Sequence, residues 1–397
     1  MPQVTAHPSS PERLPDIATL SARVDHVVDT AIAEQRIPGA VVLIARDGET
    51  VYARAAGLAD REAERPMRID TLFRLSSVSK PYVSVAALVL VHQGKLALDA
   101  PVTTWLADFK PPAPDGTMPD ITIRQLLSHT AGLGYGFLEA PDGPYHRAGV
   151  SDGMDLSGLT LDENVRRIGT VPLLFTPGTS WNYSLATDVL GAVIEHAAGL
   201  PLDKAVRDLV TEPLGVVDTG FMLTGADRLA AAYTGDPAGL RRMNELEIVP
   251  LWEGVEGLRL SPTRAFNANA FPSGGAGMIG TAGDLLRLLE TLRNGGAPLL
   301  PTPLLEEMTV DHAVGMDLAP WPGRGFGLGF SIMRNPVAAG FPEPPGTWRL
   351  GGAYGHSWSV DRTNKLTVVA FTNSGLEGQS PGGRFPADLS QAIYAGM

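Results

Sequence analysis

The chain has 397 residues, which at about 150 residues per domain corresponds to two or three folding units. Hydrophobic residues make up 44% and charged residues 19%, so the chain can build a sizeable core and is not disordered as a whole. The net charge of −12 argues against a nucleic-acid partner. The absence of cysteine excludes disulfides, iron–sulfur clusters, thiolate zinc sites and a cysteine nucleophile.

The N-terminus shows no pattern of a secretory signal. Residues 1–16 are polar and rich in proline, and no basic start leads into an apolar segment. The longest strongly apolar stretch, Val85–Val91, is far too short to span a bilayer. We therefore expect a soluble cytoplasmic protein without a membrane partner. The sequence does not indicate its oligomeric state.

The chain opens with a helix and a hairpin. Apolar residues recur at three- and four-residue steps over residues 17–35, which predicts a helix with one apolar face. Two apolar runs follow, at 40–45 and 50–56, and Asp47-Gly48 between them is typical of a hairpin turn.

A buried helix is expected next. Tyr82–Val91 is apolar on nearly all sides, which is typical of a helix surrounded by core. Because Pro81 fits only near the start of a helix, the helix should begin at Ser77–Ser79.

Residues 101–266 read as helical pieces joined by loops rich in glycine and proline. Capping boxes begin at Thr122 and Thr160, and a third helical stripe ends at Gly199. We find no convincing strand pair in this stretch, so we expect a mostly helical insertion.

The strand pattern resumes after a helix that begins at Thr281 and ends at Asn294. Strands are predicted at 326–333, 353–360 and 366–372, followed by a last helix at about 386–395. The layout predicts an α/β domain built from residues 1–100 and 267–397, with residues 101–266 inserted as a mostly helical domain. The active cleft should lie where the two meet.

Without cysteine, the candidate nucleophiles are serine, threonine, lysine and carboxylates. The eight histidines show no metal-binding spacing, so we expect no metal. One serine motif, Gly-x-Ser-x-Gly around Ser151, resembles a nucleophile elbow. That motif requires a strand before it and a helix after it. Both flanks of Ser151 are loop-like, so we interpret it as a surface loop.

A second motif, Ser-x-x-Lys at Ser77 and Lys80, stands at the start of the buried helix. Residues three apart share a helix face, so Lys80 can reach the Ser77 hydroxyl. A lysine held against apolar packing has a lowered pKa and can act as a base. The helix N-terminus also offers N–H groups to an oxyanion. The alternative is that Ser77 caps the helix and Lys80 points into solvent.

Further segments place this motif in a known superfamily. The Ser-x-x-Lys motif resembles the first motif of serine β-lactamases and penicillin-binding proteins, and other segments are similar to the class C branch. These segments are 126–133 (LLSHTAGL), 177–184 (PGTSWNYS), 274–278 (GGAGM) and 350–356 (LGGAYGH). The matches run in order from about residue 38 to 373. The resemblance implies an α+β fold with an antiparallel sheet flanked by helices, as in β-lactamases and transpeptidases.

Within that branch the chain is most similar to family VIII carboxylesterases, which hydrolyse small carboxylic esters. The resemblance implies that Ser77 is the acylated nucleophile and that Lys80 and Tyr183 share the role of general base. It also implies an oxyanion hole formed by the N–H groups of Ser77 and Ala353. Tyr183 could serve as a base only if a cation such as Lys80 lowers its pKa. No cofactor is implied.

The third motif departs from the β-lactamase pattern. β-Lactamases open it with a lysine that binds the substrate carboxylate, whereas this chain has Leu350. Leucine cannot pair with a carboxylate, which favours a neutral ester over a β-lactam. Pocket candidates are Leu350, Gly351, Gly352, Trp348, Trp181 and His356.

The sequence therefore predicts a serine esterase acting on small-molecule esters by two-step acyl transfer. Three alternatives stay open. An acyltransferase would use an alcohol or amine in place of water. A weak β-lactamase or peptidase would share the nucleophile. A non-catalytic binding module would keep the fold without the reaction.

Overall fold

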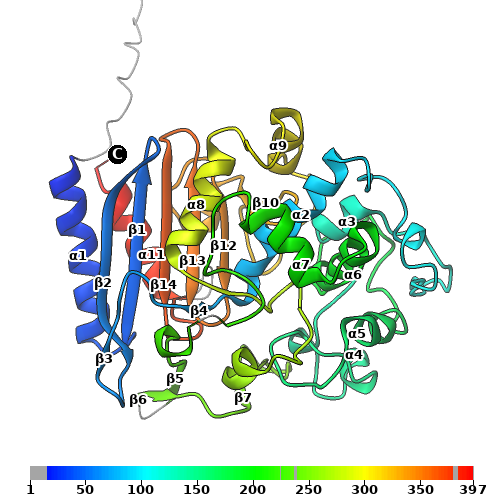
Figure 1. Ribbon diagram of the computed structural model, residues 1–397, viewed down its shortest axis with the longest axis horizontal. Coiled ribbons are helices and arrows are strands. Elements are labelled where there is room, and N and C mark those ends of the chain that lie inside the picture. Colours follow the sequence, from blue (N-terminus) through cyan, green and yellow to red (C-terminus); the bar gives the residue numbers. More distant parts are fainter. Residues whose placement is uncertain (1–15, 224, 237–238, 379–382, 397) are drawn as a thin grey trace, which may run out of the picture.

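The computed structural model describes residues 16–223, 225–236, 239–378 and 383–396. The segment in which a secretory signal was sought lies almost entirely outside these ranges. An eight-stranded antiparallel sheet lies beside the helices of the middle of the chain, with its strands in the order β10-β11-β12-β13-β14-β1-β2-β3 (Figure 1). Its strands are β1 (Gly39–Arg46), β2 (Glu49–Asp60), β3 (Arg65–Pro66), β10 (Arg324–Phe326), β11 (Ser331–Met333), β12 (Trp348–Gly352), β13 (His356–Asp361) and β14 (Leu366–Thr372).

The two ends of the chain meet inside this sheet. β1, from the N-terminal part, pairs antiparallel with β14, from the C-terminal part, in a register that runs from Ala40 opposite Thr372 to Arg46 opposite Leu366. Three short strand pairs lie outside the sheet. They are β4 (Phe73–Arg74) with β9 (Ile279–Gly280), β5 (Tyr233–Asp236) with β6 (Gly239–Arg242), and β7 (Glu247–Val249) with β8 (Leu258–Leu260).

Helices cover both faces of the sheet (Figure 1). α1 and α11 pack together on one face, and α8 lies on the other against β1 and β14. The helices are α1 (Ile17–Ala33), α2 (Ser79–His92), α3 (Ile123–Leu127), α4 (Pro144–Arg147), α5 (Leu161–Ile168), α6 (Ala186–Ala198), α7 (Leu202–Val206), α8 (Ala282–Arg293), α9 (Thr302–Thr309), α10 (Pro336–Ala339) and α11 (Arg384–Tyr394).

The alternation of side chains along β1 explains the two layers of core. Successive side chains of a strand point to opposite faces of a sheet. Val42 and Ile44 join the core beneath α1 and α11, whereas Val41 and Leu43 join the larger core on the other face. All four are buried, so β1 reads as a continuous apolar run. The antiparallel sheet between helices that the family resemblance implies is confirmed.

α2 connects the sheet to the helical part of the chain. It is buried from Ser79 to Leu90 and packs against α6 and α7. A single apolar cluster extends from β1 through α2 into the helices of residues 101–266. The two predicted domains, residues 1–100 with 267–397 and residues 101–266, therefore share one continuous core.

Several predicted elements are confirmed. α1, the β1–β2 hairpin, α2 and α8 stand where the sequence places them. The capping box at Thr122 is complete, because Thr122 accepts from the Gln125 N–H and the Gln125 side chain accepts from the Thr122 N–H. At Thr160 the structure gives only the cap to the Glu163 N–H. Gly199 ends α6 with φ of 67°, which glycine adopts readily.

Three strand predictions are wrong. Residues 101–266 contain the hairpins β5–β6 and β7–β8, whose strands of three or four residues are too short and too polar to show alternation. The single strand at 326–333 is two strands, β10 and β11, separated by a turn that includes Gly329 at φ of 110°. The strand expected from residue 353 begins at His356, and β12 before it was not predicted as a strand.

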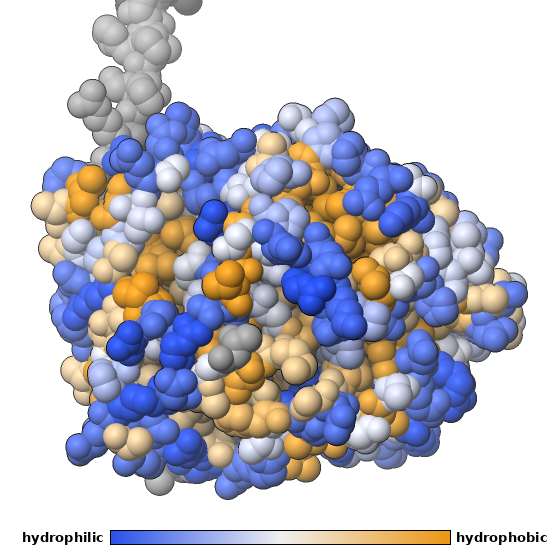
Figure 2. All heavy atoms as spheres, in the orientation of Figure 1, coloured by the Kyte–Doolittle hydropathy of each residue, from blue (hydrophilic) through white to orange (hydrophobic). Residues whose placement is uncertain are grey.

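The outer surface is of mixed polarity. Figure 2 shows hydrophilic residues over much of one face, with hydrophobic residues between them in smaller groups. Within the described ranges, no helix combines the length and the apolar character needed to cross a bilayer.

The burial of α2 predicts a large loss of stability when its side chains are shortened. Leu88 is fully buried, and Leu88→Ala should lower the free energy of unfolding in urea by about 2–5 kcal/mol, because the cavity it leaves does not collapse completely. The control is Val337→Ala, at a side chain that is 92% exposed. It should change that free energy by less than about 0.5 kcal/mol. Equal effects of the two substitutions would contradict the packing described for α2.

Candidate active site

Ser77 stands in a tight turn between the small β4–β9 pair and α2. The turn is a 3₁₀ helix over Ser76–Val78. Ser76 has φ of 42°, a left-handed conformation that costs a non-glycine residue energy and is common at functional sites. The Ser76 hydroxyl oxygen accepts from the Tyr354 N–H at 3.4 Å, which ties this turn to the segment after β12.

The end of β12 passes very close to the same turn. A Cβ on Gly352 would collide with the Leu75 carbonyl oxygen and stand 2.9 Å from Ser76 Oγ. Only glycine permits this approach. The glycine of the third motif therefore brings Ala353 to the cavity that Ser77 lines.

Lys80 is fully buried in the first turn of α2. Its Nζ donates to Ser77 Oγ at 3.2 Å, to the Tyr135 hydroxyl at 2.9 Å and to the Gly275 carbonyl at 2.9 Å. Burial lowers the pKa of Lys80 to about 7, because the charged ammonium loses its hydration. A large part of the lysine is therefore neutral near pH 7 and can take a proton from Ser77. The alternative in which Lys80 points into solvent is excluded.

Tyr183 lies immediately before α6, with its ring below the lysine. Lys80 Nζ is 4.7 Å from the centre of that ring. The backbone here is held by His129, whose Nδ1 accepts from the Ser184 N–H at 3.1 Å and whose ring lies 4.8 Å from that of Tyr183. The structure thus brings together the serine, the lysine and the tyrosine that the motifs single out.

The protonation of Tyr183 differs from what the sequence analysis requires of a base. Burial raises the pKa of Tyr183 above its ordinary value, and a hydrogen bond with Ser77 only partly offsets this. Because the pKa of Lys80 is about 7, only part of the lysine is charged near pH 7, and burial remains the largest influence on the pKa of the phenol. The raised pKa favours the protonated phenol of Tyr183, and the lowered pKa favours the neutral amine of Lys80.

Sequence reasoning missed a second tyrosine, Tyr135. It is buried, accepts the hydrogen bond from Lys80 and lines the same cavity as Ser77. Its ring stacks on Phe137 with the ring centres 4.4 Å apart. Tyr135 follows the 126–133 segment by two residues, and that nearness is the only sequence signal that could have identified it.

The cavity above Ser77 has a volume of about 300 Å³. Ser77, Tyr135 and Tyr183 supply its side-chain hydroxyls. None of the described residues that line it carries a charge. The remaining wall is apolar or small and includes Phe137, Leu138, Met154, Leu251, Trp252 and Trp321. A neutral, partly apolar molecule fits this chemistry better than an anion.

The predicted pocket residues divide into two groups. Leu350, Gly351 and Ala353 line the cavity. Gly352, Trp348, Trp181 and His356 do not. Each of these four makes contacts outside the cavity.

Gly352 packs on the turn before Ser77. Trp348 stacks on Phe330 with the ring centres 5.3 Å apart. Trp181 supports the cavity residue Trp321 from behind, at 5.3 Å between ring centres. The His356 Nε2 bonds the Arg74 carbonyl at 2.8 Å beneath the sheet core. None of these four residues lines the cavity.

Ser151 lies in a loop with neither strand before it nor helix after it, as expected. It is not at the surface, however, because only 1% of it is exposed. Its hydroxyl donates to Asp155 and accepts from the Gly153 N–H at 3.1 Å. These hydrogen bonds hold the loop together. The prediction of a loop is confirmed, but the prediction that this loop lies at the surface is wrong.

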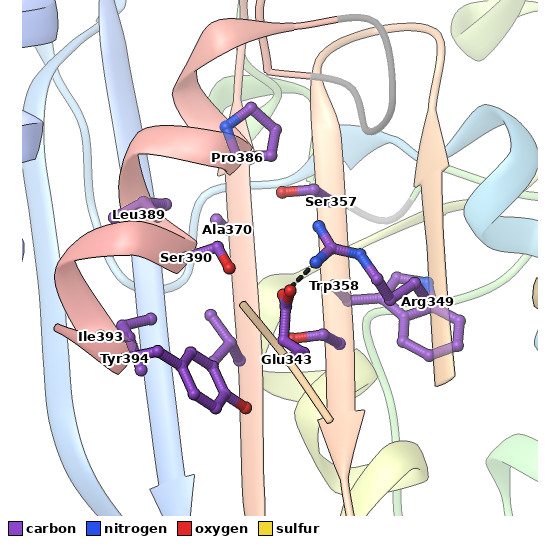
Figure 3. Close-up of a pocket in the computed structure, with 12 residues that line it drawn as sticks. Glu343, Arg349, Ser357, Trp358, Ala370, Pro386, Leu389, Ser390, Ile393 and Tyr394 are labelled. Atoms are coloured by element: carbon purple, nitrogen blue, oxygen red, sulfur yellow. Dashed lines mark hydrogen bonds and ion pairs between the residues drawn. The ribbon is translucent and has the colours of Figure 1, made fainter. Parts of the chain in front are cut away.

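A second hollow, on the α11 side of the sheet, is too small for a substrate (Figure 3). Its volume is about 20 Å³, room for little more than one water. Figure 3 shows the buried ion pair between Arg349, on β12, and Glu343 pointing into it. Tyr394 on α11 donates to Asp361 at 2.8 Å. The first of these interactions ties β12 to the segment before it, and the second ties α11 to β13. The hollow therefore does not compete with the cavity at Ser77.

Comparison with known proteins gives one consistent family. The β-lactamase family model matches residues 24–393. Esterase EstB of Burkholderia gladioli is 51% identical over 384 residues, which cover 96% of this chain and 96% of that protein. The solved structure of EstCE1, described as a hydrolase with promiscuous acyltransferase activity, has a TM-score of 0.92 and 46% identity over 95% of this chain and 99% of that chain.

The fold extends to more distant proteins. A penicillin-binding protein homolog from Caulobacter crescentus has a TM-score of 0.72 at 24% identity, over 97% of this chain and 98% of that one. The family model covers nearly the whole chain, and the relatives align end to end. The chain belongs to the β-lactamase family, in the branch that its motifs indicate, the family VIII carboxylesterases.

Proposed function

We propose that this protein is a carboxylesterase that hydrolyses small neutral esters through an acyl-enzyme on Ser77. The observation that carries the proposal is the buried Lys80 amine, 3.2 Å from Ser77 Oγ, beneath a cavity without charged lining. The identity to esterase EstB supports ester hydrolysis as the reaction.

In the acylation step, neutral Lys80 accepts the proton of the Ser77 hydroxyl while Ser77 Oγ bonds the ester carbonyl carbon. The carbonyl oxygen becomes an oxyanion, which the N–H groups of Ser77 and Ala353 stabilise. Collapse of this intermediate breaks the bond to the alcohol oxygen. Tyr183, as a neutral hydroxyl, passes a proton to that oxygen and regains one from Lys80.

In the deacylation step, water takes the place of the alcohol. Lys80, neutral again, accepts a proton from the water as its oxygen attacks the acyl carbon. The second intermediate collapses to release the carboxylic acid and the Ser77 hydroxyl. The proton that Lys80 gained returns to Ser77 Oγ, so the enzyme ends each cycle unchanged. No cofactor or metal takes part in this scheme.

A second candidate function, acyl transfer, uses the same acyl-enzyme. The relative EstCE1 is described as a hydrolase with promiscuous acyltransferase activity. The mostly apolar wall of the cavity favours an alcohol with an apolar chain as the competing acceptor. Measuring transesterification against hydrolysis in mixtures of water and a short alcohol separates the two.

On the sequence evidence we place the reaction in the cytoplasm.

Replacing the nucleophile tests the proposal directly. Ser77→Ala should lower kcat on p-nitrophenyl acetate by at least about 10⁴-fold, because the group that forms the acyl-enzyme is lost. Ser151→Ala is the matched control and should leave kcat nearly unchanged, since that hydroxyl is engaged in loop hydrogen bonds. A dead Ser151→Ala beside an active Ser77→Ala would overturn the mechanism. A wild type that turns over no ester, and takes no label from a serine-reactive probe, would support the binding-module alternative.

The pKa of Lys80 predicts the pH dependence. The reaction needs the neutral amine, so kcat/KM should rise with pH through about 7 and reach a plateau above it. Below that pH the lysine is protonated and cannot accept the serine proton. Lys80→Ala should cut kcat severely, and Tyr183→Phe in the same chain should add little, because groups acting as one unit are non-additive. An optimum at acidic pH would argue against Lys80 as the base.

Leu350 predicts poor β-lactam turnover. A β-lactam carboxylate beside this buried leucine would stay unpaired, at a cost of about 1–3 kcal/mol. Leu350→Lys should therefore raise the ratio of nitrocefin to p-nitrophenyl acetate hydrolysis, with Leu350→Met as a neutral control. If the wild type hydrolyses nitrocefin as fast as acetate esters, the assignment of this pocket wall is wrong.

A further inference from the structure

Asp188 is a buried carboxylate that the proposed mechanism does not use. It lies in the first turn of α6 and is fully buried. Its Oδ1 accepts from the Ser273 hydroxyl at 2.6 Å. None of the ion pairs among the described residues includes Asp188. A buried charge without an ion-pair partner is costly, so its retention calls for an explanation.

The other carboxylate oxygen faces the lysine across one glycine. A Cβ on Gly275 would stand 2.6 Å from Asp188 Oδ2, 3.2 Å from the Tyr135 hydroxyl and 3.5 Å from Lys80 Nζ. Asp188 and Lys80 therefore flank the same residue, Gly275, with too little room between them for any side chain at that position. The Gly275 carbonyl is also the acceptor that holds Lys80, at 2.9 Å.

The hydrogen bonds of Ser273 show how the segment is held. Its hydroxyl donates to Asp188 and accepts from the Ala276 N–H at 3.1 Å. Residues 273–276 are thus tied to α6 through Asp188, while Gly275 within them contacts Lys80. The segment comes from a part of the chain almost 200 residues beyond Lys80, and Asp188 fixes its position.

We propose that Asp188 is a positioning residue for Lys80: it holds the 273–276 segment so that the Gly275 carbonyl meets the lysine, and its negative charge faces the amine. This inference rests on the proposed function of Lys80 as the base.

The electrostatics of the pocket agree with this role. Burial lowers the pKa of Lys80, and the negative charges of Asp188 and Asp152 oppose that lowering. Burial raises the pKa of Asp188 itself, offset in part by the Ser273 hydrogen bond and by the charge of Lys80. The charged and titratable groups around Asp188 are Lys80, Asp152, Arg264, Tyr135 and Tyr183.

The negative charge of Asp188 raises the pKa of Lys80. Removing the negative charge of Asp188 leaves the ammonium form of Lys80 less stabilised, so the pKa of Lys80 falls further. The neutral amine then persists to lower pH. The acid limb of the activity profile should move to lower pH, whereas a residue with only a structural role would lower the rate without moving that limb.

The experiment compares the wild type with Asp188→Asn in the full-length protein. Two pH profiles are measured, kcat/KM on p-nitrophenyl acetate and the rate at which a fluorophosphonate probe labels Ser77, followed by intact mass. Asp188→Asn should shift the acid limb of both profiles down by about half a pH unit or more. It should also lower kcat by about tenfold or more, with a smaller change in KM.

Ser273→Ala is the matched control, because it removes the anchoring hydrogen bond and keeps the carboxyl group of Asp188. It should lower kcat without a shift of the acid limb to lower pH. If Asp188→Asn does not fold, as judged by circular dichroism, the kcat and KM of Ser273→Ala test the proposal. A kcat equal to that of the wild type would overturn the proposal, and a tenfold loss at unchanged KM would support it.

The outcomes separate this inference from the proposed function. If the probe does not label Ser77 in the wild type, the proposed function fails. If the wild type is labelled with an acid limb near pH 7, and folded Asp188→Asn keeps that limb at the same pH, only the role of Asp188 is overturned.

Discussion

The burial of one lysine amine sets the conditions for the rest of the site. Lys80 is surrounded by hydrogen-bond acceptors and aromatic rings, and none of the ion pairs among the described residues includes it. A buried ammonium group loses its hydration, and the surrounding groups do not fully replace it. The equilibrium therefore shifts toward the neutral amine. Burial lowers the pKa of Lys80 and so provides a neutral amine within hydrogen-bond distance of Ser77.

Holding that amine requires segments from distant parts of the chain. The turn before α2 supplies Ser77 and the start of α2 supplies Lys80. The loop after α3 supplies Tyr135, the segment before α6 supplies Tyr183, and the segment before β9 supplies the Gly275 carbonyl. The core that packs α2 against the sheet and against α6 fixes their relative positions. Glycine at 275 and 352 allows two of these approaches, because a side chain at either position would collide with its neighbour.

The sequence predicts well the parts of the site whose partners are close along the chain. Ser77 and Lys80 stand three residues apart on a helix start, and helical spacing alone puts them on one face. Tyr183 came from a motif resemblance. Tyr135 and Asp188 were missed because their partners are 55 and 85 residues away, and no local pattern marks a residue whose role depends on such a distant contact.

The same reasoning explains the errors in the fold. β12 contains Gly351-Gly352 and was not recognised, because glycine is rare in strands and the reason for it, the close approach to the Ser77 turn, is a tertiary contact. The turn between β10 and β11 is not apparent in the sequence, because its apolar residues continue the apolar pattern of the two strands. Trp348 and His356 looked like pocket residues from their nearness to the third motif, but the pleat of β12 and the start of β13 turn them into the core.

The central claim is that the reaction passes through a covalent intermediate on Ser77. The most direct measurement is rapid mixing with excess p-nitrophenyl ester, acid quenching within the first turnover, and peptide mass mapping of the quenched protein. The account predicts an acyl mass added to the peptide that contains Ser77, appearing with the first equivalent of p-nitrophenol. An active enzyme whose acyl adduct maps to another residue, such as Ser151, would contradict it.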